Sequence, residues 1–421
     1  MENHALELVD FDFDRDMDDV LAMWKEVGWC DEERTEPFVR EFFQANDGRS
    51  VVARLNGRAE SVAHRSLGSI KYGADRELSA GAITAVTTSR IGRRLRGASR
   101  LTARSVATLG GEGCAIALLG MFEQGFYDRF GFGVGPYEHV VRVSPGSLRV
   151  PCEYRTPERF DFENHSEELY EAVVRRHRGH GGLLIGGERA ARTIVMLDQQ
   201  SSVYGYRTDG VLSHWIAVEH QGEHGPDNVI AWAYETPAQC LELLRLCQEW
   251  SDQTDVIRFT EPVWLQAQDF IDAPGTNRRR THGSKASVST EAFAWWQIRI
   301  LDLAACVRPM VAVEDPFDVV VDLSDPIGSH LVDSGYDGSW EPLTGLWRLS
   351  FSESHSAERL PDGSEAADLT TSVNALSRWW LGVLPASALA AVGQMDGDPA
   401  IFERLDLLTA HLPRPQPGWD F

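Results

Sequence analysis

The chain has 421 residues, of which 43% are hydrophobic and 24% are charged, which is enough material for two or three domains. Its formal net charge of −23 disfavours binding to nucleic acid or to a membrane surface and favours a cationic substrate, although acidity of this kind also serves solubility alone. No apolar run is long enough for a transmembrane helix, and the acidic opening Met1–Asp18 does not resemble a signal peptide.

The six cysteines are spread along the chain, and none of them forms a CxxC pair. A zinc site is therefore not expected, and no other pattern of metal ligands stands out. Unpaired thiols suit a reducing cytoplasm, where the protein is expected to reside.

Residues 1–150 alternate expected strands and helices, which predicts a first α/β domain. Asp16 is expected to cap one helix, and a second helix is expected over Glu36–Ala45. The Asn56-Gly57 pair predicts a hairpin turn between two strands. The expected strands are Ala5–Phe11, Ser50–Leu55, Ser61–Lys71, Glu77–Thr87, Cys114–Met121 and, as the last strand of this domain, Tyr137–Val143.

Two further units are expected after residue 150. Residues 151–292 repeat the order of strands and helices more loosely, which predicts a second, degenerate domain. Residues 293–421 open with the apolar, strand-like segment Trp296–Leu303 and continue as a third α/β unit. Prolines hold the final segment, Pro413–Phe421, extended.

The segment between Thr84 and Arg100 is the most informative in the chain. A strand runs into a loop that contains Arg93, Arg94 and Arg96, and a helix is expected directly after Gly97. The first turn of a helix presents unpaired N–H groups and partial positive charge, and arginines add contacts to phosphate oxygens. A glycine such as Gly97 lets the backbone approach a phosphate closely. The pattern therefore indicates a phosphate site, although a basic stretch of this kind is also typical of a solvated surface.

Four motifs carry a resemblance to a known family. Arg94–Ser99 resembles the R/Q-x-x-G-x-G/A acyl-CoA loop of GNAT acetyltransferases, and more closely the R-R-x-G-x-x-R loop of the enhanced intracellular survival (Eis-like) N-acetyltransferases. Phe126–Gly133, Trp296–Asp302 and the terminal Trp419-Asp420-Phe421 are similar to further segments of that family. Departures from the family pattern lie in the proline-free stretch 87–93, in Leu95 and in Phe122.

The resemblance implies an α/β (α+β) fold with two GNAT-like domains that contain mixed sheets, at residues 1–150 and 151–292, and a sterol-carrier-protein-like domain at residues 293–421. It also implies acetyl-CoA as the co-substrate and a homo-hexamer. The residues expected to bind acetyl-CoA are Ala85, Val86, Thr87, Arg93, Arg94, Arg96, Gly97, Ala98 and Ser99.

The resemblance assigns the acid and the base of acetyl transfer. Tyr127 is expected to protonate the leaving thiolate, and the terminal carboxylate of Phe421 is expected to act as the base. Its sequence context alone favours Tyr127 as a core tyrosine of an aromatic cluster over a catalytic tyrosine, and a C-terminus is by default disordered. Asp31 is expected to rim an acceptor cleft, and Asp420 is expected to add negative charge near the acceptor amine.

We therefore expect an acetyl-CoA-dependent N-acetyltransferase acting on a primary amine of a cationic small molecule, such as an aminoglycoside-like antibiotic or a polyamine. Protein lysines are the alternative acceptor within the same chemistry. A rival of another class is a non-catalytic protein that binds acyl-CoA or lipid.

Overall fold

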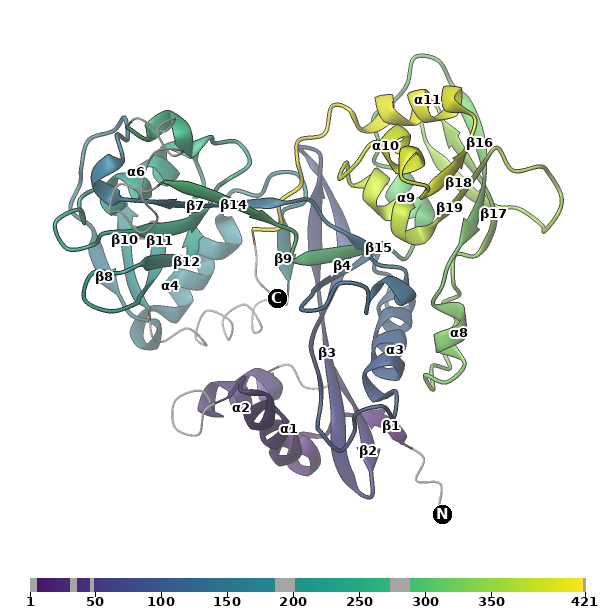
Figure 1. Ribbon diagram of the computed structural model, residues 1–421, viewed down its shortest axis with the longest axis horizontal. Coiled ribbons are helices and arrows are strands. Elements are labelled where there is room, and N and C mark those ends of the chain that lie inside the picture. The colour runs from purple at the N-terminus through teal and green to yellow at the C-terminus, as the bar shows by residue number, and fades with distance from the viewer. Residues whose placement is uncertain (1–5, 31–35, 46–48, 186–200, 273–287, 419–421) are drawn as a thin grey trace. The chain divides into compact units, whose positions relative to one another are not determined.

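The computed structural model describes residues 6–30, 36–45, 49–185, 201–272 and 288–418 (Figure 1). The chain forms two compact units. One consists of Met1–Pro136, Gly179–Ala190 and Trp295–Phe421, and the other of Tyr137–Arg178 and Ala191–Ala294. Both units therefore contain segments that are distant in the sequence.

The first unit contains an eight-stranded mixed sheet in the order β1-β2-β3-β4-β5-β15-β6, with β9 beside β3. Only β4 and β5 pair in parallel, and the helix α3 (Gly97–Gly111) connects them, as a parallel connection requires. The strands are β1 Glu7–Asp10, β2 Ser50–Leu55, β3 Arg58–Tyr72, β4 Arg76–Thr88, β5 Ile116–Gly120, β6 Gly133–Val134, β9 Leu183–Ile185 and β15 Trp296–Ile300.

Helices cover both faces of this sheet because successive residues of a strand point to opposite sides. Val52 of β2 packs in one core with α1 (Phe13–Val27) and α2 (Glu36–Ala45). Its neighbours Val51 and Ala53 pack in another core with Leu101 of α3. The helix α3 therefore lies on one face of the sheet and α1 and α2 lie on the other (Figure 1).

The sequence predicted a hairpin turn at Asn56-Gly57 and a cap for the first helix. Asn56 and Gly57 have φ values of 52° and 84°, so the hairpin turn predicted between β2 and β3 is confirmed. The cap predicted for the first helix is wrong: Asp12 accepts the hydrogen bond from the Arg15 backbone, whereas Asp16 is buried within the helix and pairs with Arg54.

The second unit contains a seven-stranded mixed sheet in the order β14-β7-β13-β12-β11-β10-β8, in which only β12 and β13 are parallel. Its strands are β7 Glu138–Val143, β8 Glu158–Phe160, β10 Ser202–Thr208, β11 Val211–His220, β12 Asp227–Ala233, β13 Ile257–Thr260 and β14 Ser289–Phe293. In the described part of this unit, the helices are α4 (Phe162–Arg175), which follows β8 in the chain, and α6 (Pro237–Gln248), which connects the parallel pair. The strand order therefore parallels that of the first sheet.

The two sheets exchange their late strands. The strand β7 follows β6 in the chain but pairs with β13 and β14 of the second sheet. The strand β15 follows β14 but pairs with β5 and β6 of the first sheet. Placing Tyr137–Val143 as the last strand of the first domain was therefore wrong, and Trp296–Ile300 belongs to the first sheet.

The last part of the first unit contains a five-stranded mixed sheet in the order β18-β17-β16-β19-β20. Its strands are β16 Phe317–Ser324, β17 Gly345–Phe351, β18 Ser356–Arg359, β19 Leu369–Ser372 and β20 Met395–Gly397. The helices here are α7 Leu303–Val307, α8 Gly328–Leu331, α9 Val373–Trp380, α10 Ala386–Ala391 and α11 Pro399–Thr409. Of the helices in the described residues, none combines the length and apolarity needed to cross a bilayer.

Candidate active site

The first sheet opens into a fork between β4 and β5. The strand β4 pairs with β5 only over Ala80–Ile83 and then continues to Thr88. A bulge accompanies this change, because the pairing of β3 with β4 shifts register next to His64, and Ala85 has a φ of 55°. The segment of β4 that holds Ala85, Val86 and Thr87 therefore runs past the end of its pairing with β5.

The helix α3 begins shortly after this fork without a side-chain cap. Its N-cap residue Arg96 has a φ of 64°, and its side chain forms no capping hydrogen bond. Arg100 donates its backbone N–H to the Arg96 carbonyl, at 3.0 Å, as the first full turn closes. The N–H groups of Gly97, Ala98 and Ser99 precede that bond, so they have no intrahelical partner and are suited to an anion.

The loop between β4 and α3 is fixed by two glutamates. The Ser89 N–H donates to the Glu60 carbonyl at 3.0 Å, and the Ser89 hydroxyl bonds the Glu60 carboxylate. The Gly92 N–H donates to the Ser89 hydroxyl at 2.9 Å. The Arg90 N–H donates to Glu26 at 2.7 Å. Because these bonds use backbone and short side chains, they hold the loop without occupying the arginines that follow.

The three predicted arginines differ in their surroundings. Arg93 and Arg94 are exposed and, within the described residues, form no ion pair or hydrogen bond through their side chains. The Arg96 guanidinium lies 3.2 Å from the carboxylate of Asp333. Arg93 and Arg94 therefore present unneutralised positive charge beside the open end of α3.

Gly97 has a structural role that the sequence did not reveal. A Cβ built on Gly97 would lie 2.3 Å from the Ser61 hydroxyl oxygen and 3.6 Å from the Ala53 Cβ. The absent side chain thus faces β3, and glycine is needed for α3 to pack closely on the sheet. The role predicted for Gly97 from the sequence is the close approach of a phosphate. That role concerns the side of Gly97 that points away from β3.

Tyr127 is buried at the fork. Its side chain is 8% exposed and packs in one core with Ile83 and Leu119, the last pair that joins β4 to β5. The rings of Phe126 and Phe132 lie 4.8 and 6.3 Å from its ring. Burial raises the pKa of Tyr127 to about 12, so the phenol is protonated at neutral pH.

The turn that carries Tyr127 is fastened by the last part of the first unit. The Asn374 side-chain amide, on α9, donates to the carbonyls of Asp128 and Phe132, both at 2.8 Å. Gln297, on β15, donates to the Asp128 carboxylate at 2.7 Å. These contacts fix the backbone on both sides of the short helical turn Asp128–Phe130 that follows Tyr127.

A fully buried ion pair completes this support. The Arg299 guanidinium binds the Asp325 carboxylate at 3.0 and 2.5 Å, and it also donates to the Phe130 carbonyl. A Cβ on Gly131 would collide with this guanidinium, which explains the glycine. Sequence reasoning noted Arg299 only as part of a family motif; no spacing links it to Asp325.

Two aromatic rings lie beyond the end of β5. Phe122 is 87% exposed, and its ring lies 5.5 Å from that of Trp29. Trp29 in turn contacts Trp24 of α1 at 5.6 Å. An exposed aromatic pair of this kind can bind a cation.

The C-terminal segment runs along the first sheet. The Gln416 N–H donates to the His180 carbonyl at 3.0 Å, and the Leu183 N–H donates to the Pro417 carbonyl at 2.9 Å. Pro415 and Pro417 are buried.

Three predicted site residues, Asp31, Asp420 and Phe421, lie outside the described residues. Across the described ranges, no group of three or more His, Cys, Asp or Glu side chains could hold a metal ion.

Two family models match the chain. Residues 13–135 match the acetyltransferase (GNAT) domain, and residues 337–416 match the sterol carrier protein domain. No curated protein matches the chain in sequence.

Solved structures of similar fold cover almost the whole chain. A probable N-acyltransferase from Enterococcus faecalis is 13% identical, covers 98% of this chain and 99% of its own, and has a TM-score of 0.74. A GCN5-related N-acetyltransferase from Kribbella flavida is 17% identical, with coverage of 99% and 98% and a TM-score of 0.73. Eis1 from Mycobacterium abscessus is 16% identical, with coverage of 99% and 100% and a TM-score of 0.74. At these identities the likeness shows the fold.

The class of protein follows from these findings. The predicted fold class is confirmed: the chain combines mixed α/β sheets, a GNAT domain and a C-terminal sterol carrier protein domain. The chain contains an acetyltransferase (GNAT) domain at residues 13–135, and GNAT domains use acetyl-CoA.

Proposed function

We propose that this protein is an Eis-like N-acetyltransferase that transfers the acetyl group of acetyl-CoA to a primary amine of a cationic small molecule, such as an aminoglycoside-like antibiotic or a polyamine. We further propose that it works as a cytoplasmic homo-hexamer. The observation that carries the proposal is the fork after Ile83, which lies beside the uncapped start of α3.

Each part of acetyl-CoA has a matching chemical environment. The pyrophosphate binds the N–H groups of Gly97, Ala98 and Ser99, with Arg93, Arg94 and Arg96 as counter-charges. The pantetheine lies in the fork and pairs with the backbone of Ala85, Val86 and Thr87. An N–H of this β4 segment also stabilises the oxyanion, because donors that are already in place cost no reorganisation.

The reaction forms a C–N bond and breaks a C–S bond. The acceptor ammonium first loses a proton, and the Phe421 carboxylate takes it. A free α-carboxyl has a pKa of about 3.5, so this base requires a dry pocket or an intervening water. The amine attacks the thioester carbonyl, the oxyanion collapses, and the thiolate leaves with a proton from Tyr127. The pKa of Tyr127, raised by burial to about 12, keeps that proton available at neutral pH.

The acceptor site is proposed at the exposed end of β5. A cationic acceptor suits the net charge of −23, the acids Asp31 and Asp420, and the aromatic pair Trp29 and Phe122. Protein lysines remain the alternative acceptor. The match to a sterol carrier protein domain at residues 337–416 favours lipid binding as the second candidate function.

Calorimetric titration with acetyl-CoA tests donor binding. We expect binding by the wild-type chain, and a loss of about tenfold or more in affinity for the double variant Arg93→Gln/Arg94→Gln. Arg142→Gln is the matched control, since within the described residues the Arg142 side chain likewise forms no hydrogen bond, ion pair or ring contact. Equal affinity in the double variant would place the phosphates elsewhere.

A panel of aminoglycosides, polyamines and lysine peptides in a CoA-release assay then identifies the acceptor.

A further inference from the structure

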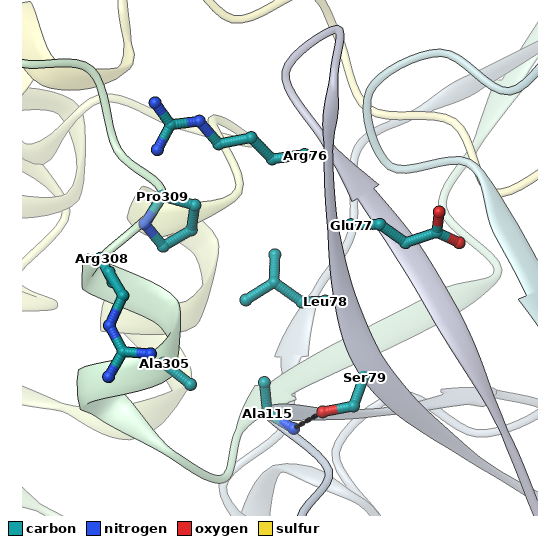
Figure 2. Close-up of a pocket in the computed structure, with 8 residues that line it drawn as sticks. All are labelled: Arg76, Glu77, Leu78, Ser79, Ala115, Ala305, Arg308 and Pro309. Atoms are coloured by element: carbon teal, nitrogen blue, oxygen red, sulfur yellow. Dashed lines mark hydrogen bonds between the residues drawn. The ribbon is translucent and has the colours of Figure 1, made fainter.

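A pocket of about 470 Å³ lies at the start of β4, away from the fork (Figure 2). Its lining comes from β4, from the residue before β5 and from the end of α7. Along β4, the pocket ends at Ser79 and the proposed acyl-CoA site begins at Ala85, so about 20 Å of strand separates the two features. The pocket is therefore distinct from the proposed acyl-CoA site.

Two arginines on different elements border this pocket. Arg76 extends from β4 toward Pro309, and Arg308 lies on the opposite wall beside Ala305 (Figure 2). Leu78 projects from β4 on the same side as Arg76, whereas Glu77 projects to the other side, as strand alternation requires. Glu77 also belongs to the pocket lining, and its carboxylate is paired there with Lys71 at 3.3 Å.

Unpartnered arginines are unusual in this acidic chain. Among the described residues of the first unit, four arginine side chains have no hydrogen bond, ion pair or ring contact: Arg76, Arg93, Arg94 and Arg308. Two of them lie on the proposed acyl-CoA loop, and the other two border this pocket. Unneutralised cations placed beside apolar surface are suited to an organic anion.

Hydrogen bonds hold both walls of the pocket. The Ser79 hydroxyl accepts from the Ala115 N–H at 3.0 Å (Figure 2). It also donates to the Gly113 carbonyl at 2.8 Å. The helix α7 is capped by Asp302, which accepts from the Ala305 N–H at 2.9 Å. These hydrogen bonds involve neither of the two arginine side chains.

We propose that this pocket binds a small organic anion, whose carboxylate or phosphate is attracted by the positive charges of Arg76 and Arg308 at its two ends and whose short apolar group covers Leu78 and Pro309. The apolar lining favours such an amphiphilic anion over an inorganic ion. The proposal does not depend on the acetyl-transfer reaction, since no residue of the pocket belongs to the proposed catalytic machinery.

Calorimetric titration of the full chain with octanoate and with octyl phosphate tests the proposal and distinguishes the two anionic groups. Octanol and octylamine are the controls for the apolar group and for charge. We expect at least one of the two anions to bind, and we expect Arg76→Gln and Arg308→Gln each to weaken that binding by about tenfold. The double variant Arg93→Gln/Arg94→Gln and the control Arg142→Gln should bind as wild type.

Several results would overturn the proposal. The proposal is wrong if neither anion binds or if octanol binds as tightly as the anions. It is also wrong if Arg76→Gln and Arg308→Gln bind the anion with unchanged affinity. A loss confined to the Arg93→Gln/Arg94→Gln variant would show that the anion occupies the acyl-CoA loop instead. Because Arg76 and Arg308 are exposed, these variants are expected to melt as the wild type does, which excludes misfolding as the cause.

Discussion

Replacing Gly97 by alanine should move the start of α3. The new Cβ would lie 2.3 Å from the Ser61 hydroxyl oxygen, where ordinary contact begins at 3.4 Å, so the helix must shift by about 1 Å. Overpacking of this kind costs about 1–3 kcal/mol, and a 1 Å misplacement of reacting groups costs up to about 100-fold in rate. We therefore expect Gly97→Ala to lower kcat/KM for acetyl-CoA by about 10- to 100-fold in a CoA-release assay.

A second substitution separates the two explanations for this glycine. Ser61→Gly removes the two atoms closest to the new Cβ, the Ser61 Oγ at 2.3 Å and the Ser61 Cβ at 3.0 Å. The double variant Gly97→Ala/Ser61→Gly should therefore recover most of the lost kcat/KM. If glycine is needed only for close approach of a phosphate, Ser61→Gly restores nothing. Wild-type kinetics in the single variant would refute the packing argument altogether.

Three further predictions concern buried ionisable groups. Burial lowers the pKa of His64 to about 3, so the stability that its neutral form contributes is present above pH 6.5 and is lost as the pH falls. Urea unfolding should show a loss of about 3 kcal/mol between pH 7 and pH 4 that is reduced in His64→Gln. Asp325→Asn leaves the buried Arg299 charge without a counter-charge and should lower the free energy of unfolding by about 3–5 kcal/mol in the same experiment. A decrease below about 1 kcal/mol contradicts this. Burial also raises the pKa of Tyr127 to about 12, so the ultraviolet difference between wild type and Tyr127→Phe should show no phenolate at pH 10.

The hairpin turn and the buried strand β5 of the first domain could be predicted because each depends on residues that are neighbours in the sequence. Asn56 and Gly57 both take positive φ values in a two-residue hairpin turn, and this is the turn found. The continuous apolar run of β5 reflects burial on both faces. The first helix shows the limit of such signals: several acids precede it, and only the fold shows that Asp12 rather than Asp16 caps it.

The remaining features depend on contacts between distant residues. The pattern of Glu138–Val143 predicts a strand but not which sheet it joins, and its partners lie in the second sheet. Similarly, Arg299 and Asn374 hold the Tyr127 turn from positions far along the chain. The pocket that Arg76 and Arg308 border could not be predicted from the sequence either, because no periodicity relates these two residues.

The most direct test of the acetyl-transfer proposal is the initial rate of CoA release from acetyl-CoA, in the presence of an accepted amine, for three chains. These are wild type, Tyr127→Phe and a chain that lacks Phe421. If Tyr127 is the acid and the Phe421 carboxylate is the base, each change should lower kcat by about 100-fold, while the affinity for acetyl-CoA stays the same. Wild-type rates in both variants would contradict the assignment of acid and base, and a wild-type chain that acetylates no amine would contradict the proposed function.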